Sequence, residues 1–308
     1  MKKAVVTGAT GFVGRHVVWE LLDAGYTVTA LVRSPAKANA LYRGNPTDAF
    51  LHTVECELSQ LKNYAETAGE KGDVFFHLAW EGVSGALLRD YDTQMKNMRY
   101  AIDAIRAAKT LGCKRFVGAG SLHENECMNE LETSTSEVGL GNYYKAAKLS
   151  AHYFCQTEAS RIGIEFLWPR LTNAYGAGER SERLLNSVIR QLLRGESPAL
   201  TDGTQLYNFI YVTDAARAFR LLAEKGRPFA HYVLGSEDVR PLREYLAQVQ
   251  QIVAPEVPMG FGKHTAQGIH LSEKELYSPA LRQDTGFETS VPFADGIRRT
   301  MDQMKDQV

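Results

Sequence analysis

Residues 5–14 read Val5-Val6-Thr7-Gly8-Ala9-Thr10-Gly11-Phe12-Val13-Gly14. A short apolar run leads into three glycines, and a helical pattern follows with its apolar residues on one face. Gly8 would let the chain turn sharply off a strand, and the missing Cβ of Gly11 would let a pyrophosphate approach the backbone. Gly14 would let the helix pack closely on the sheet, and the N–H groups at the helix start suit phosphate. The stretch therefore predicts a dinucleotide-binding turn.

The rest of the first half alternates strand and helix patterns. Strands are expected at 4–7, 26–32, 51–56, 74–79, 114–118 and 164–168. Helices are expected at 11–24, 91–111 and 143–161. Strands separated by helices of this length predict an α/β fold of the Rossmann type, with a doubly wound parallel sheet.

The regular alternation of strand and helix patterns ends at about residue 173, and the chain after it is richer in loops. Further helices are expected at 184–193 and 242–253, and 209–222 again resembles a strand followed by a helix. We expect a dinucleotide-binding domain at 1–173, with 208–223 returning to it. Residues 174–207 and 224–308 would form a smaller substrate-binding lobe over the carboxyl edge of the sheet, which would create a cleft.

Composition narrows the class of protein. The 308 residues carry a formal net charge of −1 with scattered lysines and arginines, so nothing indicates binding to nucleic acid or a membrane surface. The four cysteines form no CxxC pair and are typical of reduced thiols in a cytoplasmic protein. His77 and His123 lack a third ligand at suitable spacing, and His77 lies in an apolar strand as a core residue would, so we expect no metal.

Two positions indicate proton-transfer chemistry. Tyr144 and Lys148 are four residues apart on a predicted helix, so their side chains share one face. An ammonium beside a phenol stabilises the phenolate and lowers the tyrosine pKa, which suits a general acid or base for a carbinol–carbonyl pair. Ser121 follows the fifth strand, where its hydroxyl could bind a substrate oxygen.

These motifs together resemble the extended short-chain dehydrogenase/reductase family, and more narrowly its NAD-dependent epimerase/dehydratase branch, which acts mostly on nucleotide-activated sugars. The resemblance covers nearly the whole chain. It rests on the 8–14 turn, Asp73-Val74-Phe75-Phe76-His77-Leu78-Ala79, Asn97, Ser121, Tyr144-Lys145-Ala146-Ala147-Lys148, Arg170-Leu171-Thr172-Asn173-Ala174-Tyr175-Gly176 and Asn208-Phe209-Ile210-Tyr211-Val212-Thr213-Asp214.

The resemblance implies a role for each matching position. The catalytic residues would be Ser121, Tyr144 and Lys148. The cofactor would be bound by Gly8, Thr10, Gly11, Phe12, Val13, Gly14, Arg33, Ser34, Lys37, Glu57, Leu58, Leu78, Ala79, Asn97, Tyr144 and Lys148. The substrate would be bound by Ser121, His123, Asn173, Arg180, Tyr207 and Arg282.

The end of the second strand selects the cofactor. An acidic residue there would bind the ribose 2′-hydroxyl of NAD, whereas arginine accommodates the 2′-phosphate of NADP. This chain has Arg33-Ser34, with Lys37 soon after and no acid among them. Arginine binds phosphate in bidentate fashion and the serine hydroxyl can add a bond, so we expect NADP(H), with NAD as the alternative.

Two departures from the family pattern bear on the reaction. Dehydratases of the branch carry an acidic pair directly after the catalytic Ser/Thr, whereas Leu122 and His123 follow Ser121 here and Glu124 comes third. Dehydration is therefore not favoured. Many sugar-nucleotide enzymes of the branch also have an arginine where this chain has Tyr207. The arginines that could replace it in binding a diphosphate are Arg180, Arg183 and Arg282.

The sequence thus predicts an NADP(H)-dependent oxidoreductase that reduces a keto-(deoxy)sugar nucleotide. The alternatives are a nucleotide-sugar epimerase that retains NAD and, from another class, a non-catalytic NADP-binding sensor. The family often forms homodimers through its two long helices, and we expect the same here. The surface expected for this contact contains Tyr100, Ala104, Ala107, Ala147, Ala151 and Phe154.

Overall fold

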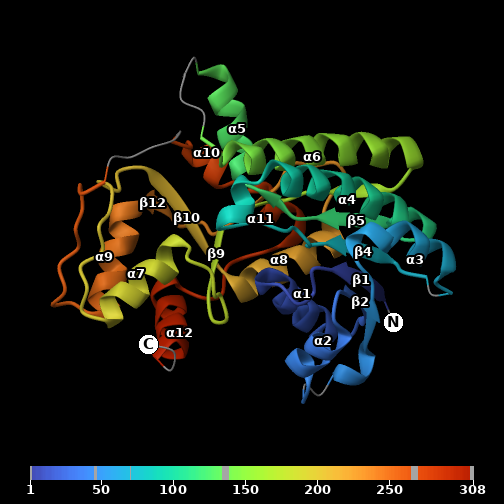
Figure 1. Cartoon of the computed structure of the whole chain (residues 1–308), viewed down its shortest axis with the longest axis horizontal. Helices are drawn as coiled ribbons and strands as arrows, with labels where there is room; N and C mark the ends of the chain where they lie inside the picture. Colours follow the sequence, from blue (N-terminus) through green and yellow to red (C-terminus); the bar gives the residue numbers. More distant parts are fainter. Residues whose placement is uncertain (1, 45–46, 70, 134–138, 265–269, 306–308) are drawn as a thin grey trace.

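The computed structural model describes residues 2–44, 47–69, 71–133, 139–264 and 270–305, and it has two unequal parts (Figure 1). The larger part is built on a six-stranded sheet in the order β3-β2-β1-β4-β5-β7, with every neighbouring pair parallel. Its strands are β1 (Lys3–Thr7), β2 (Thr27–Val32), β3 (Leu51–Glu55), β4 (Val74–His77), β5 (Arg115–Gly118) and β7 (Glu165–Leu167). This order confirms the predicted doubly wound Rossmann sheet, whose switch point lies between β1 and β4.

Helices cover both faces of this sheet. One face carries α1 (Phe12–Asp23), α2 (Pro35–Tyr42) and α8 (Val212–Lys225), and the other carries α3 (Leu61–Thr67), α4 (Tyr91–Thr110) and α6 (Asn142–Ile162). Successive strand residues face opposite sides, so Val6 packs with α1 and α8 while Val5 packs with α3 and α4. Burial on both faces explains why the inner strands β1, β4 and β5 are mostly apolar, whereas the edge strand β3 carries His52 and Glu55.

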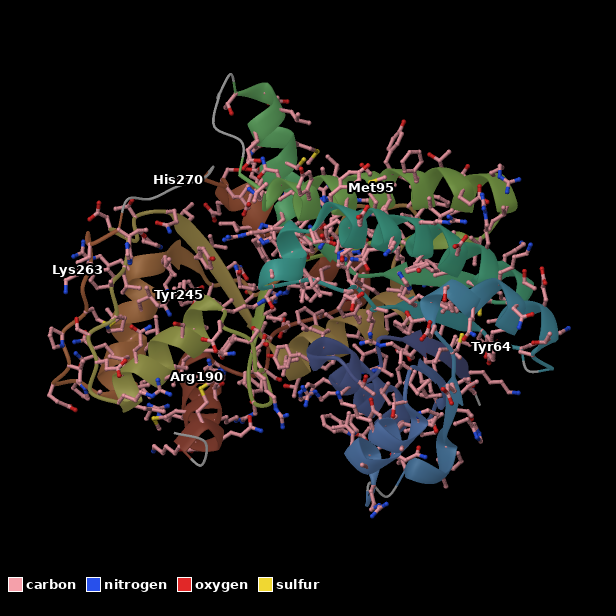
Figure 2. The ribbon with its side chains drawn as sticks, in the orientation of Figure 1. Tyr64, Met95, Arg190, Tyr245, Lys263 and His270 are labelled. Atoms are coloured by element: carbon pink, nitrogen blue, oxygen red, sulfur yellow. The ribbon has the colours of Figure 1, made fainter. Side chains whose placement is uncertain are left out.

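A second sheet and three helices form the smaller part. β9 (Asn173–Tyr175), β10 (Leu206–Tyr211) and β12 (Val239–Pro241) pair in the order β12-β10-β9. They pack with α7 (Leu184–Leu193), α9 (Leu242–Val253) and α12 (Phe293–Lys305) around a core that includes the fully buried Tyr245 (Figure 2). α7 and α9 have the predicted bounds.

The segment 208–223 divides its contacts between the two parts. Its strand, β10, pairs with β9 and β12 and does not join the six-stranded sheet. Its helix, α8, packs against α1 on the face of that sheet. Only the helix therefore returns to the larger part, and the division of the chain into two domains near residue 173 stays a prediction.

Short elements connect the two parts. β6 (Gly120–Ser121), β8 (Arg170–Leu171) and β11 (Val233–Leu234) form a third small sheet. α5 (His123–Glu132) follows β6 and projects away from the body beside α10 (Glu273–Leu276), and α11 (Ala280–Thr285) packs on α8 (Figure 1). The sequence analysis did not anticipate α5, which begins two residues after Ser121.

The prediction of the dimer surface is wrong for its four alanines. Four small residues of that surface lie buried where α4 packs against α6 within the chain, namely Ala104, Ala107, Ala147 and Ala151. The outward faces of the two helices instead expose large apolar side chains, including Tyr91, Met95, Tyr143, Tyr153 and Phe154.

Cys56, Cys113, Cys127 and Cys155 are all buried and unpaired. Among the described residues, no helix combines the length and apolar character that a membrane span requires.

Candidate active site

The glycine turn between β1 and α1 is closely packed. Gly8 has a φ of +74°, and a Cβ at this position would lie 2.5 Å from the backbone nitrogen of Ala79. A Cβ on Gly14 would lie 2.0 Å from the Gly8 carbonyl oxygen. Gly11 is the N-cap of α1 and donates its N–H to that same oxygen at 2.9 Å. These contacts confirm the sharp turn at Gly8 and the close helix packing at Gly14.

A cavity of about 440 Å³ opens at the switch point between β1 and β4. Most of the predicted cofactor-binding residues line it, namely Gly8, Thr10, Gly11, Arg33, Lys37, Glu57, Leu58, Leu78, Ala79 and Asn97. Phe12 and Val13 pack against the core instead, and Gly14 packs on the turn. The loop after β4 adds Trp80 and Glu81, which the sequence analysis missed. The turn without side chains and the free N-terminus of α1 suit a dinucleotide pyrophosphate, so the residues present fit a nicotinamide cofactor.

The far end of this cavity carries positive charge. Arg33 and Lys37 line it, and Arg33 lies 3.7 Å from the exposed carboxylate of Glu81. Ser34 does not line it. Its hydroxyl caps α2 by accepting the N–H of Lys37 at 3.3 Å. Two cations beside a helix N-terminus form a suitable site for a phosphate group.

Ser121, in β6, and Tyr144, on α6, line the same cavity. The Ser121 hydroxyl accepts the backbone N–H of His123 at 3.3 Å, and its interaction with the phenol of Tyr144 lowers the pKa of that phenol. Burial raises the pKa of Tyr144 and outweighs the opposite effect of the Ser121 hydrogen bond. The expectation that Lys148 lowers this pKa is therefore wrong for the structure as it stands.

The Lys148 ammonium contacts groups other than the phenol. Its ammonium donates to the carbonyl of Ala119 at 2.8 Å and lies 3.7 Å from the ring centroid of Trp80. The indole N–H of Trp80 donates to Gln94 at 2.9 Å, which anchors the ring. Burial lowers the pKa of Lys148 to about 7, although the Glu124 carboxylate acts in the opposite direction. Trp80 thus shields the ammonium by a cation–π contact between the cofactor cavity and Tyr144.

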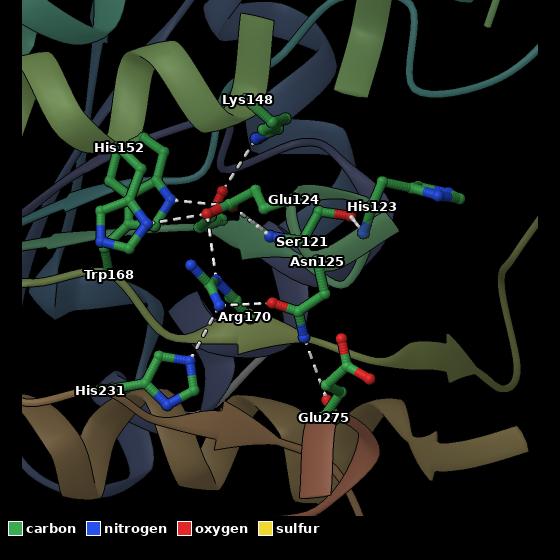
Figure 3. A network of polar contacts seen from close by, with 11 residues as sticks. Ser121, His123, Glu124, Asn125, Lys148, His152, Trp168, Arg170, His231 and Glu275 are labelled. Carbon is green, nitrogen blue, oxygen red and sulfur yellow. Dashed lines mark hydrogen bonds and ion pairs between the residues drawn. The ribbon is translucent and has the colours of Figure 1, made fainter. Parts of the chain in front are cut away.

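Glu124 is the centre of a buried polar network (Figure 3). Its carboxylate accepts the backbone N–H of Ser121 at 2.8 Å, the indole N–H of Trp168 at 3.1 Å and the Arg170 guanidinium at 3.3 Å. His152 Nδ1 lies 2.7 Å from the same carboxylate. Burial opposes ionisation, but these partners hold the pKa of Glu124 below its ordinary value. Glu124 therefore supports Ser121 from within the core.

A second cavity, of about 400 Å³, lies where the two parts of the chain meet. Ser121, His123, Tyr144, Asn173 and Tyr207 line it, as expected for substrate-binding positions. The sequence analysis missed the rest of this wall, which includes Val83, Leu88, Glu126, Leu184 and Leu206, together with His270 beside α10 (Figure 2). These residues lie in loops, in a short 3-10 turn, in α5, at the start of α7 or at the start of β10, where the sequence offers no motif.

The predicted arginines separate into two groups. Arg183, the N-cap of α7, lines the second cavity and is its only lysine or arginine among the described residues. Arg180 does not line it. Arg282 lies beside a different, shallow pocket and is paired with Glu237 at 3.0 Å and Glu288 at 2.6 Å. The structure therefore does not bring Arg180 or Arg282 to the site of Ser121 and Tyr144.

His77 is a packed core residue, as expected. It is buried in β4, and its Nδ1 lies 2.9 Å from the hydroxyl of Thr7. Burial lowers its pKa to about 3, so the ring is neutral.

Comparison with known proteins defines the class of this enzyme. The NAD dependent epimerase/dehydratase family model matches residues 4–235, which is most of the chain. The chain therefore belongs to this family of enzymes, within the extended short-chain dehydrogenases/reductases.

Named relatives align with nearly the whole chain. A dTDP-glucose 4,6-dehydratase of Haemophilus influenzae is 24% identical over 98% of this chain and 97% of its own length. A dTDP-glucose 4,6-dehydratase of Xanthomonas campestris is 25% identical, covering 97% and 92%.

Solved structures share the fold. A UDP-N-acetylglucosamine 4-epimerase from Methanobrevibacter ruminantium superposes with a TM-score of 0.81 at 21% identity, covering 100% of this chain and 99% of its own. The enzyme WbmF of Bordetella bronchiseptica, in complex with NADH, has a TM-score of 0.78 at 20% identity and covers 99% and 92%.

Proposed function

We propose that this protein is an NADP(H)-dependent oxidoreductase that reduces a keto-(deoxy)sugar linked to a nucleotide. The observation that carries the cofactor choice is the pair of cations, Arg33 and Lys37, at one end of the dinucleotide cavity. A 2′-phosphate would bring negative charge to these two cations, whereas the ribose hydroxyls of NAD would bring none.

The residues around the second cavity support proton transfer to a carbonyl. The bound nicotinamide would supply the hydride. Tyr144 is positioned to give a proton to the carbonyl oxygen and Ser121 to hydrogen-bond that oxygen, because both residues line the same cavity wall. The raised pKa of Tyr144 keeps its proton in place until a substrate oxygen accepts it. We assign Lys148 and Asn97 to the nicotinamide side of the site.

Neither Leu122 nor Glu124 supplies the acid that dehydration would need beside Ser121. Elimination of water from a sugar needs an acid for the leaving hydroxyl and a base for the neighbouring C–H. Glu124 cannot be that acid because it is fully buried and bonded to Ser121, Trp168 and Arg170. Leu122 next to Ser121 has no proton to give.

The nucleotide of the substrate would bind against the wall of the second cavity that the smaller part of the chain forms. Arg183 and the N-terminus of α7 are the groups suited to a diphosphate, and leucines at 184, 206 and 271 would border the base. Tyr207 stands where the family resemblance implies an arginine in many members, and burial raises the pKa of Tyr207 to about 12, so it contributes a neutral hydroxyl.

A direct assay distinguishes the oxidoreductase from its rivals. The enzyme is mixed with NADPH or NADH and a panel of keto-deoxyhexoses linked to dTDP, UDP, GDP or CDP, and the loss of reduced cofactor is recorded. We expect net consumption of NADPH with one of these sugars. Arg33→Ala should weaken NADPH binding and leave NADH binding unchanged, whereas Arg298→Ala, at an exposed ion pair on α12, serves as the matched control.

An NAD-dependent epimerase is the second candidate. Structurally similar proteins include epimerases bound to NAD, and the Glu81 carboxylate beside Arg33 competes with a phosphate for that guanidinium. An epimerase recycles its cofactor, so the purified protein would retain NAD and show no net consumption of NADPH. A non-catalytic sensor would bind NADP and keep its output after Tyr144→Phe, whereas an enzyme would lose turnover.

We also propose a homodimer in the cytoplasm. The apolar side chains exposed on the outer faces of α4 and α6, such as Tyr91, Tyr153 and Phe154, are suited to pair with a second copy. Phe154→Glu should convert a dimer into a monomer in sedimentation velocity, and a wild-type monomer at micromolar concentration would contradict the proposal. Four unpaired cysteines support a reducing compartment.

A further inference from the structure

Trp80 stands between the two cavities of the site. Its side chain lines the dinucleotide cavity, and its ring meets the ring of Tyr144 edge to face with the centroids 6.2 Å apart. Tyr144 in turn lines the second cavity. The indole therefore forms part of the boundary across which a bound cofactor would face a substrate.

Two residues of α4 fix the position of this indole. Its N–H donates to the side-chain oxygen of Gln94 at 2.9 Å, and the Gln94 amide donates to the carbonyls of Gly82 and Leu87 at 3.0 and 2.9 Å. Asn97 bonds both the backbone N–H and the carbonyl of Glu81, at 3.0 and 2.7 Å. Gln94 and Asn97 are buried, so the loop that carries the indole is tied to α4 at three successive residues.

The face of the indole contacts an ammonium that lacks an anionic partner. The Lys148 Nζ atom lies 3.7 Å from the Trp80 centroid and 5.8 Å from that of Trp168. It donates to the Ala119 carbonyl at 2.8 Å. Lys148 is 4% exposed and forms no ion pair within the described part of the chain. A buried charge in such a place is unfavourable, and an indole face is the aromatic surface that stabilises an ammonium best.

We propose that Trp80 is a positioning residue for Lys148, whose ammonium the indole face holds charged and in place at the border of the dinucleotide cavity. This inference rests on the proposed function, which assigns Lys148 to the nicotinamide side of the site. Trp80 acts through Lys148 and not on the substrate. The contact exists only while the amine is protonated, because a neutral amine carries no charge for the ring to attract.

Lys148 changes its charge near neutral pH, whereas the groups that act on it do not. Burial lowers the pKa of Lys148 to about 7. The partners of Glu124 hold its pKa below the ordinary value, so it stays a carboxylate above pH 5. Burial raises the pKa of Cys155 to about 12 and lowers that of His77 to about 3, and it also raises the pKa of the Tyr144 phenol. Between pH 5 and pH 9 these four neighbours therefore keep one charge state each.

A double-mutant cycle in chemical denaturation measures the contact without cofactor or substrate. Its four proteins are the full-length wild type, Trp80→Leu, Lys148→Met and the double variant. Loss of the Gln94 bond and titration of His152 occur on both sides of the cycle and cancel. We expect coupling of about 10-fold in the folding equilibrium at pH 5 and less than about 2-fold at pH 9. Trp80→Phe keeps a weaker aromatic face, so its own cycle should give an intermediate value and remains usable if Trp80→Leu does not fold.

The pH profile of reduction provides the catalytic readout. The kcat/KM for NADPH is measured from pH 5 to pH 9 with a sugar nucleotide that the enzyme reduces. The wild-type value should fall above about pH 7, as Lys148 loses its proton. Trp80→Leu should move this fall about one pH unit lower, because the contact favours the protonated amine, and Trp80→Phe should restore part of the shift. Trp19→Leu removes a half-buried indole on α1 that packs between His16 and Tyr42, and it should leave the profile unchanged.

Each outcome separates the two hypotheses. Equal coupling at pH 5 and pH 9, no coupling at either pH, or an unshifted profile in Trp80→Leu would reject the role of Trp80 and leave the reductase function in place. If no sugar of the panel consumes NADPH, the reductase function is rejected, and the denaturation cycle still decides whether Trp80 holds the Lys148 ammonium.

Discussion

Replacement of Glu124 by glutamine tests whether the buried network supports the site. The carboxylate is inaccessible to solvent and accepts bonds from Ser121, Trp168 and Arg170, with His152 Nδ1 at 2.7 Å. Glutamine has nearly the same shape, but its NH₂ group would face donors where an acceptor is required. The change leaves the guanidinium of Arg170, 12% exposed, without its anion.

The expected cost follows from the loss of one partner of a buried ion pair. Such a loss destabilises a protein by about 3–5 kcal/mol, because the remaining charge stays buried without compensation. For a chain of this size, each kcal/mol lowers the melting temperature by roughly 2 °C, so Glu124→Gln should melt about 6–10 °C below the wild type. Glu132→Gln, at an exposed position of the same helix, should melt within about 1 °C of it.

The pH dependence gives an independent check. The pKa of Glu124 is lowered in the folded state, so its contribution to the free energy of unfolding is complete above the ordinary pKa of 4.5. That contribution is lost as the pH falls below 4.5 toward the folded-state pKa. The gap between wild type and Glu124→Gln in calorimetric or fluorescence melts should therefore be full at pH 7 and shrink under acid. An unchanged melting temperature at pH 7, or a gap that widens on acidification, would refute the network as described.

Three further variants test separate parts of the account. Tyr144→Phe should reduce turnover by at least 100-fold while the dissociation constant for NADPH, from fluorescence titration, changes little. Lys148→Met should melt above the wild type at pH 7, because the folded state disfavours the buried ammonium. Since the folded pKa is about 7, wild-type stability should rise from pH 7 toward pH 10 relative to this variant, and a fall in that range would contradict the assignment. Gly14→Ala should cost about 1–3 kcal/mol in chemical denaturation and abolish NADPH binding, because its Cβ would collide with the Gly8 carbonyl, whereas Gly69→Ala, in open space, should do neither.

Much of the fold could be predicted from local patterns. The strand–glycine–helix unit at 5–14 and the mostly apolar strands at 74–77 and 115–118 predict a parallel sheet buried on both faces, because each pattern depends only on residues that are neighbours in the sequence. β10 was harder to place. Its strand pattern says nothing about which sheet it joins, and the choice depends on pairing with β9 and β12, which are distant in sequence.

The site residues that belong to a sequence motif could be predicted, whereas the contacts made only through tertiary structure could not. The motif placed Ser121 and Tyr144 together, but it gave the wrong effect of Lys148 because Trp80, sixty-eight residues earlier, holds the ammonium. The family resemblance also implies a substrate-binding role for Arg282, but its guanidinium is paired with Glu237 and Glu288. Glu126 was missed because a lone acid on an unpredicted helix has no pattern, and only α5 brings it to His123.

The most direct test of the central claim is the structure of the protein crystallised with NADP⁺. The account predicts the pyrophosphate at Gly11 and the N-terminus of α1, the 2′-phosphate between Arg33 and Lys37, and the nicotinamide ring beside the phenol of Tyr144. A cofactor bound elsewhere, or a nicotinamide ring remote from Tyr144 with the 2′-phosphate in solvent, would contradict it.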